Sequence, residues 1–274
     1  MNLIGLNELG EIDRWTLERR SRVLVEPVYV GDAQALTRIL GRYKFYVSTR
    51  DVGFGAHVLL DGCWESWLTV FMARRVSPGM HVVDAGANHG YYTVMFADLV
   101  GPSGRVAAFE PNPGLAALLR KSVTVNGFAS RVEVHEVALS AEDGGSIELH
   151  ASADEPKNGV IAPAGGGGLA VRSATLTAAL GAWPRVDFLK IDVEGAEEAV
   201  LAGAWPLIVR DLPSMVLEFN VGRSRSAAAL LDQLEALYGD ARAINYDGAD
   251  EAVVRSALLD PSNKEDWLLY FARE

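Results

Sequence analysis

The stretch from His81 to Thr93, HVVDAGANHGYYT, constrains the fold of this chain more than any other. A short apolar run ends at Asp84, small residues then alternate with Gly86 and Gly90, and an apolar helical pattern follows. This order predicts a strand, a tight turn and a helix. Glycines let the backbone approach a ligand closely, because they lack Cβ and reach positive φ at little cost. We therefore expect a cofactor-binding turn here.

The spacing of these glycines argues against a dinucleotide. A dinucleotide-binding turn carries glycines at its first, third and sixth positions. Counted from Gly86, the third position is Asn88 and the sixth is Tyr91, while Gly90 is the fifth. Asp84 would also place a carboxylate close to a bound phosphate, whereas it would attract the ammonium and sulfonium groups of S-adenosylmethionine (SAM). The turn therefore favours SAM.

A second acidic residue stands at the offset expected for binding a ribose. In RVAAFEPNP the apolar run ends at Glu110, 20 residues after Gly90. An acidic residue at the end of that strand can receive the two ribose hydroxyls of an adenosine. Pro111 and Pro113 then stop the strand, and Pro113 can open the next helix.

Two further apolar runs end in polar residues. VDFLKID reads as a buried strand that ends at Asp192, with Glu194 at the start of the following helix, and SMVLEFN carries Glu218 and Asn220 at its end. Ligands of doubly wound sheets bind outside the carboxyl ends of the strands, so these side chains are site candidates. For Glu194 a second interpretation stays open, because acids are favoured in a first helical turn without any catalytic role.

The strings VVDAGANHGYYT, AFEPNP and DFLKIDVEGAE, in this order and spacing, resemble the FkbM-like branch of class I SAM-dependent methyltransferases. The resemblance covers roughly residues 64–272, and members of the family are mostly O-methyltransferases that act on hydroxyls of natural products and glycans. It implies an α/β, Rossmann-like fold with a mostly parallel seven-stranded sheet and helices on both faces. The cofactor-binding positions that we expect are Asp84, Gly86, Asn88, Gly90, Tyr92, Thr93, Glu110, Asn112, Glu136, Ala138 and Asp192.

Residues 1–76 precede the cofactor domain, which we place at 77–274. The pattern predicts an amphipathic helix from Leu6 to Leu17, a second helix around Ala33–Leu40, a short strand in KFYVSTRD and a helix after Asp61. No linker of biased composition separates this segment from the rest, so we expect a helical N-terminal cap on the core domain. Additions of this kind supply the substrate side of class I methyltransferase sites.

The substrate-binding candidates are Arg50, His57, Trp64 and Glu65 of the cap, together with Asn220. The alternative is that Trp64 is a core aromatic of an amphipathic helix and that Arg50 forms a surface pair with Asp51. Both interpretations stay open.

The rest of the chain continues the alternation of strands and helices. RVEVHEV predicts a strand, Gly144–His150 an extra strand, and the last run, WLLYFA, a buried strand that inserts antiparallel to the others. Residues 151–170 lack periodicity and read either as a flexible lid or as an ordinary surface excursion. Lys157 and Asn158 of that stretch could reach a substrate.

Methyl transfer needs the acceptor aligned with the S–CH3 bond, and a hydroxyl acceptor also loses a proton to a nearby base. Asp192 is the first candidate base, followed by Glu194, Glu218 and His89, whose side chain could equally point to solvent. Asp192, Glu218 and Asn220 could alternatively hold a divalent cation through oxygen ligands. Nothing resembles a His/Cys zinc site.

The net charge of the chain limits the classes of partner that it can bind. The formal net charge of −11 argues against nucleic acid and against an anionic membrane surface, so a small-molecule or glycan acceptor fits better. The N-terminus lacks the pattern of a signal peptide, no apolar run is long enough to span a membrane, and Cys63 is the only cysteine. These features suit the cytoplasm, and a homo-oligomer is left open.

Three rivals to an O-methyltransferase remain. An N-methyltransferase would use the same cofactor site with a different acceptor pocket. A nicotinamide-dependent oxidoreductase is disfavoured by the missing glycines of the phosphate turn. A non-catalytic nucleoside-binding module would have no need of Asp84, Glu110 and Asp192 together.

Overall fold

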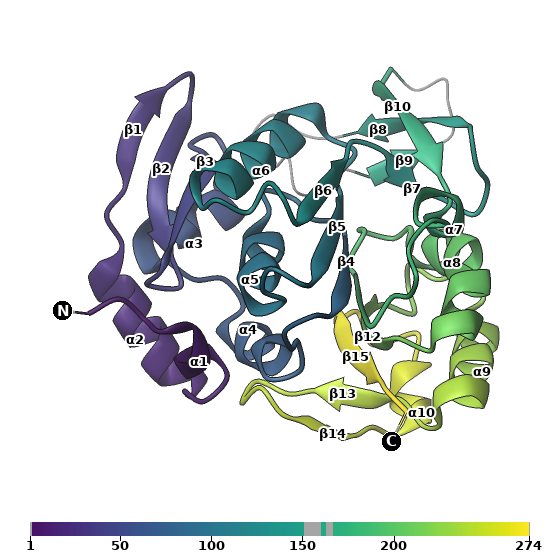
Figure 1. Ribbon diagram of the computed structural model, residues 1–274. Coiled ribbons are helices and arrows are strands. Elements are labelled where there is room, and N and C mark those ends of the chain that lie inside the picture. The colour runs from purple at the N-terminus through teal and green to yellow at the C-terminus, as the bar shows by residue number, and fades with distance from the viewer. Residues whose placement is uncertain (1, 151–159, 163–166, 274) are drawn as a thin grey trace.

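A mixed sheet of eight strands runs through the middle of the protein in the computed structural model, which describes residues 2–150, 160–162 and 167–273 (Figure 1). In sheet order its strands are β14 (Asp250–Ala252), β13 (Arg242–Ile244), β15 (Trp267–Phe271), β12 (Ser214–Phe219), β11 (Phe188–Ile191), β4 (His81–Ala85), β5 (Arg105–Phe109) and β6 (Val132–His135). Six of them run parallel, and β15 and β14 run in the opposite direction.

The sheet departs from the prediction by one strand. Seven strands were expected, and the eighth, β14, is a short segment that pairs antiparallel with β13 at the edge of the sheet. The last strand agrees with its prediction, because β15 inserts antiparallel between β12 and β13. Leu269 and Phe271 of β15 are fully buried, so this strand anchors the C-terminal end of the chain in the core.

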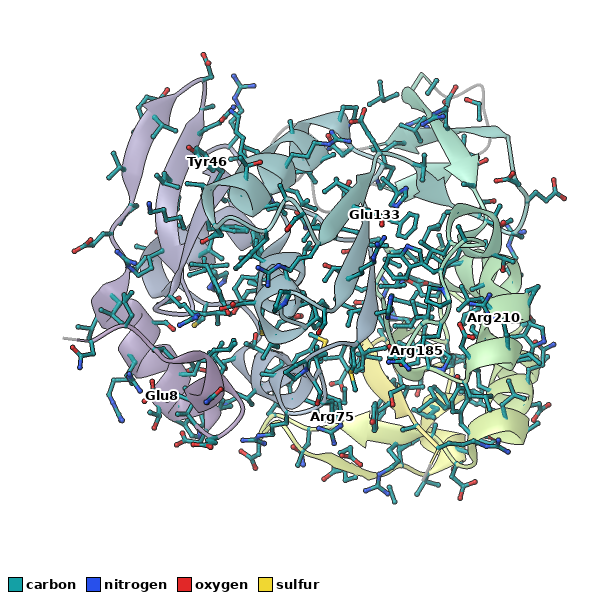
Figure 2. All side chains as sticks on the ribbon, in the orientation of Figure 1. Glu8, Tyr46, Arg75, Glu133, Arg185 and Arg210 are labelled. Carbon is teal, nitrogen blue, oxygen red and sulfur yellow. The ribbon has the colours of Figure 1, made fainter. Side chains whose placement is uncertain are left out.

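Helices cover both faces of the sheet, as predicted. On one side lie α4 (Ser66–Ala73), α5 (Tyr91–Leu99) and α6 (Pro113–Val125), and on the other α7 (Leu176–Ala179), α8 (Glu197–Asp211), α9 (Ala227–Tyr238) and α10 (Arg255–Leu258) (Figure 1). Helix α6 begins at Pro113, and the side chain of Asn112 caps it by accepting from the N–H of Gly114 at 2.9 Å. Charged side chains such as Arg210 point outward from these layers (Figure 2).

The N-terminal segment contains a sheet as well as helices. Besides α4 it holds α1 (Leu6–Leu9), α2 (Arg14–Leu24) and α3 (Phe54–Asp61), and three antiparallel strands, β1 (Val28–Gly31), β2 (Gln34–Ile39) and β3 (Tyr43–Ser48). The helix predicted at Ala33–Leu40 is therefore wrong, and the cap is not purely helical. In β2 alternate residues are buried, so the strand has one face in the core, and β3 pairs with it along its whole length.

This segment shares a core with the sheet. Phe45 and Phe54 belong to the same cluster of buried apolar side chains as Val94 and Phe96 of α5. Strand β3 also contacts helix α6 directly, because the N–H of Tyr46 donates to Ser122 Oγ at 2.9 Å. The cap is thus fixed against the two helices that follow the cofactor strands.

A small third sheet lies at one end of the molecule, in the order β7 (Ala138–Leu139), β10 (Leu169–Ala174), β8 (Ser146–His150) and β9 (Val160–Ala162) (Figure 1). Strand β8 confirms the extra strand predicted at Gly144–His150. Most of the predicted lid, with Lys157 and Asn158, lies outside the described residues. None of the helices in the described ranges is long and apolar enough to cross a lipid bilayer.

Candidate functional site

A pocket of about 350 Å³ opens beyond the carboxyl ends of β4, β5, β11 and β12. The chain runs from β4 outward to β5 and β6 on one side, and β11 and β12 occupy the other side. Such a reversal of strand order opens a crevice for a ligand. The predicted residues that line the pocket are Trp64, Glu65, Gly86, Asn88, Tyr92, Glu110, Asn112, Ala138, Asp192, Glu194 and Glu218.

The glycine turn brings two strand ends into backbone contact. Gly86 has φ of +78°, and a Cβ added there would lie 1.7 Å from the carbonyl oxygen of Asp192. Gly90 has φ of +93°, and its added Cβ would lie 2.7 Å from Leu119 Cγ. Both positions therefore need glycine for conformation and for space. The turn consequently places the end of β11 beside the end of β4.

Glu110 presents a nearly buried carboxyl to the pocket. Its two oxygens accept hydrogen bonds from the backbone N–H groups of Asn88 and Asn112, each at 2.8 Å. Burial raises the pKa of Glu110 to about 7, and the two N–H donors act in the opposite direction. The carboxyl is thus held in one orientation and titrates near neutral pH.

A buried ion network lies beneath the turn. Asp84 accepts from the Thr93 hydroxyl at 2.6 Å, and its other oxygen lies 3.6 Å from Lys190 Nζ, which in turn lies 3.0 Å from an Asp192 oxygen. Burial raises the pKa of Asp84, and Lys190 opposes that shift. For Lys190 burial disfavours the charge, but the carboxylates of Asp192 and Asp84 outweigh it and raise its pKa. Lys190 therefore stays charged and orients Asp192.

Sequence reasoning missed Lys190, although a signal for it was present. A lysine inside the apolar run VDFLKID is unusual, because a buried charge needs partners. Here the partners are the acidic residues at the ends of two neighbouring strands.

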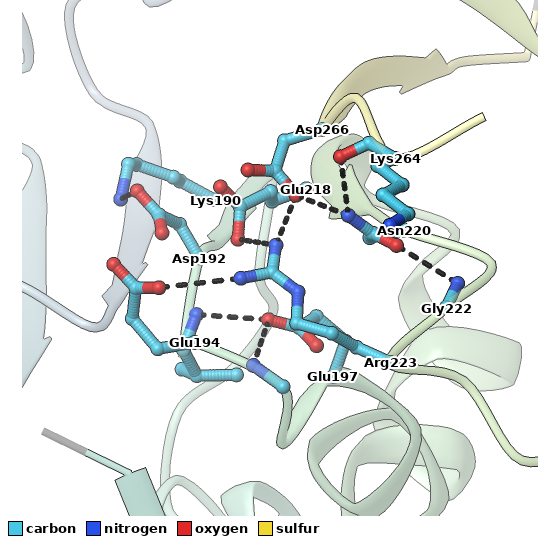
Figure 3. Close-up of polar contacts among 12 residues, drawn as sticks. Lys190, Asp192, Glu194, Glu197, Glu218, Asn220, Gly222, Arg223, Lys264 and Asp266 are labelled. Atoms are coloured by element: carbon cyan, nitrogen blue, oxygen red, sulfur yellow. Dashed lines mark hydrogen bonds and ion pairs between the residues drawn. The ribbon is translucent and has the colours of Figure 1, made fainter. Parts of the chain in front are cut away.

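The acidic wall of the pocket is organised around Arg223, in the loop after β12 (Figure 3). Its guanidinium contacts Glu194 at 3.3 Å, Glu218 at 2.9 Å and Asp266. Burial and the nearby Asp192 carboxylate raise the pKa of Glu218, and Arg223 opposes them. Arg223 and Asp266 were not predicted, because they are 43 residues apart and meet only in the fold.

The three cation ligands considered from sequence are all engaged with other groups of the protein. Asp192 pairs with Lys190, and Glu218 pairs with Arg223. The amide of Asn220 donates to Asp266 at 2.8 Å, while its oxygen accepts from the N–H of Gly222 at 2.8 Å (Figure 3). Among the residues that the structure describes, no group of three or more His, Cys, Asp or Glu side chains could hold a metal ion.

The N-terminal segment supplies aromatic side chains to the same pocket. Phe54 and Trp64 line the pocket with their rings edge to face at 5.4 Å, beside Tyr91 and Tyr92. Tyr92 donates its hydroxyl proton to Glu65 Oε2 at 2.7 Å. Glu65 itself has φ of +39°, a strained conformation for a residue other than glycine.

The remaining predicted residues lie outside this pocket wall. Asp84 and Thr93 are fully buried next to the glycine turn, and Gly90 belongs to the turn itself. His89, in the same turn, is also fully buried. Arg50 lines a second cavity of about 750 Å³. His57 is exposed beside Asp61, and Glu136 pairs with Arg120 at 2.8 Å on the surface.

The methyltransferase FkbM domain family matches residues 84–243, which is more than half of the chain, and the protein belongs to this family. The match includes the glycine turn, Glu110, Asp192 and Glu218. SAM is accordingly the cofactor of the protein.

Several solved structures are similar in outline. The FkbM methyltransferase from Methylobacillus flagellatus is 17% identical with a TM-score of 0.44, and the similarity covers 81% of this chain but only 56% of that protein. A putative O-methyltransferase from Klebsiella pneumoniae is 12% identical (TM-score 0.43, coverage 77% and 81%). The O-methyltransferase TomG from Streptomyces achromogenes, solved with SAM, is 13% identical (TM-score 0.42, coverage 76% and 79%). These distant similarities say nothing about the acceptor, and no curated protein matches the chain.

Proposed function

We propose that the protein transfers the methyl group of SAM to a hydroxyl of a small molecule, a natural product or a glycan. The observation that carries the proposal is the pair of carboxyl groups, Asp192 and Glu218, in a pocket that aromatic side chains of the N-terminal segment also line. A hydroxyl acceptor must lose its proton during transfer, and a carboxylate within hydrogen-bonding reach can take it.

The pocket residues fit SAM. Glu110 keeps a fixed carboxyl toward the pocket, suited to accept from the ribose hydroxyls, and acidic side chains surround the region where a sulfonium would be attracted. When bound, SAM supplies the activated methyl group. The chain's own residues bind and orient the two reactants and receive the proton.

Asp192 is the base that the geometry favours. Its carboxylate is held by Lys190 Nζ at 3.0 Å and is about one-third exposed, so it is both oriented and accessible. Glu218 is the weaker candidate for the base, because burial raises its pKa and its Oε2 already accepts from Arg223. Glu194 lies at the rim, where Arg223 also holds it.

Trp64 and Phe54 suit the flat face of a sugar or an aromatic ring, and Glu65 offers an oxygen to a neighbouring hydroxyl. The acidic net charge supports an acceptor other than nucleic acid, and we place the reaction in the cytoplasm. A homo-oligomer would be compatible with this site.

The test is methyl transfer from isotopically labelled SAM to a panel of monosaccharides, oligosaccharides, phenols and amines, read by mass spectrometry of the products. We expect an O-methylated product whose formation falls about a hundredfold or more in Asp192→Asn. The surface variant Glu133→Gln serves as the control. A product methylated on nitrogen would overturn the hydroxyl acceptor, and binding without transfer to any acceptor would favour the binding module.

A further inference from the structure

His89 is buried behind the glycine turn, where its ring faces the N-terminal segment. The ring of Phe54 stacks on it with the centroids 5.0 Å apart. The backbone N–H of Ser48, the last residue of β3, donates to His89 Nε2 at 3.3 Å. Two elements of the N-terminal segment, β3 and α3, therefore dock on this one side chain.

The surroundings of His89 fix its tautomer. Burial lowers the pKa of His89 to about 3, so the neutral ring has one donor and one acceptor nitrogen. Because Nε2 accepts from Ser48, we assign the proton to Nδ1, which lies 2.6 Å from Asn88 Oδ1 and donates to it. The Asp51 carboxylate lies 4.0 Å from Nδ1.

From Asn88 the hydrogen bonds continue to the cofactor site. Asn88 has φ of +54°, and its Oδ1 also accepts from the backbone N–H of His89 at 2.8 Å. The backbone N–H of Asn88 donates to Glu110 Oε2 at 2.8 Å. An unbroken path therefore runs from Ser48 through His89 and Asn88 to the carboxyl that we expect to bind the ribose.

We propose that His89 is a positioning residue that holds the glycine turn in its cofactor-binding conformation, through its bond to Asn88, when the N-terminal segment is docked. His89 does not line the pocket, so it acts through Asn88 and Glu110 and is not a base. The same segment brings Trp64 and Glu65 to the pocket, so docking couples the cofactor side to the acceptor side. The inference rests on the SAM site and is independent of the acceptor.

Two amide substitutions at His89 each retain one of the two hydrogen bonds that the ring makes, to Asn88 or from Ser48. In His89→Asn the amide nitrogen lies near the Nδ1 position and can still donate to Asn88, whereas in His89→Gln the amide oxygen lies near Nε2 and can still accept from Ser48. We expect the Kd of S-adenosylhomocysteine, measured by calorimetry, to rise about tenfold in His89→Gln and to stay within about threefold in His89→Asn. We expect both variants to lower Tm. If His89 had only a structural role, the loss of affinity in each variant would follow its loss in Tm.

A second substitution tests the route through Asn88. Asn88→Gly tolerates the positive φ but removes Oδ1, so it should weaken binding about as much as His89→Gln, and the two changes together should cost no more than either alone. Additive losses, losses that follow Tm, or wild-type affinity in a folded His89→Gln would overturn the proposal. If His89→Gln does not fold, wild-type affinity in Asn88→Gly overturns it instead. Failure of the wild-type protein to bind S-adenosylhomocysteine would overturn the cofactor assignment itself, and this inference with it.

Discussion

Glu110 is a buried carboxyl whose charge depends on two opposing effects. Burial raises its pKa to about 7, while the N–H groups of Asn112 and Asn88 stabilise the ionised form. The ionised group is the stronger acceptor for ribose hydroxyls, and it is lost as the pH falls through the pKa. We expect the Kd of S-adenosylhomocysteine to rise about tenfold between about pH 8 and pH 6, and to stay flat in Glu110→Gln. Calorimetry at both pH values checks this, and an equal slope in the variant would assign the titration to another group.

Gly86 and Gly127 are two glycines of similar conformation at which the effect of an added Cβ can be compared. Both have positive φ, +78° and +76°, but an added Cβ meets the Asp192 carbonyl at 1.7 Å in the first and nothing within 4 Å in the second. Gly127→Ala should cost about 1 kcal/mol of unfolding free energy from conformation alone. Gly86→Ala should cost about 3 kcal/mol or more and abolish cofactor binding, because β4 and β11 must separate. Urea denaturation measures both, and equal losses would contradict the close approach.

At the scale of elements, local motifs were predictable and long-range pairings were not. The β4 turn, the strand that ends at Glu110 and the helix that opens at Pro113 each depend on neighbouring residues, so the sequence indicated them correctly. The helix predicted around Ala33–Leu40 is wrong, because pairing with β1 and β3, which lies outside the local pattern, makes this segment a strand. The positions of Arg223 and His89 depend in the same way on partners 43 and 41 residues away.

The loop that carries Arg223 gives a prediction at this scale. Arg223→Met removes the cation that Glu194, Glu218 and Asp266 share, so the pKa of Glu218 rises further. A carboxyl whose folded pKa is raised destabilises the folded state as the pH rises through that pKa. Because the pKa of Glu218 is already about 9 in the wild type, the further loss through this group should be small near pH 7 and grow to about 1–2 kcal/mol near pH 10, after allowance for solvent screening. Chemical denaturation at both pH values tests this, with exposed Arg225→Met as control, and a loss that grows toward low pH would contradict it.

At the scale of the whole molecule, one apolar cluster joins the N-terminal segment to a face of the central sheet. It contains Phe45 and Phe54 of the segment, Phe96 of α5 and Phe188 of β11, all buried. The sequence boundary at residue 76 therefore separates regions that share a core. Because each region would expose apolar surface without the other, we expect them to unfold together.

Unfolding of the full chain tests this cooperativity. Phe45→Ala opens a cavity in the segment, next to Phe54 and Tyr91 at ring distances of 6.1 and 6.5 Å, and should cost about 3–5 kcal/mol. Phe271→Ala makes the matched change in β15, on the opposite face of the sheet. Tryptophan fluorescence and far-UV circular dichroism should give one coincident urea transition in the wild type and in both variants, shifted to lower urea with an unchanged slope. If Phe45→Ala produced a separate early transition, the segment would be an independent unit, and its docking could not be required for the cofactor turn to form.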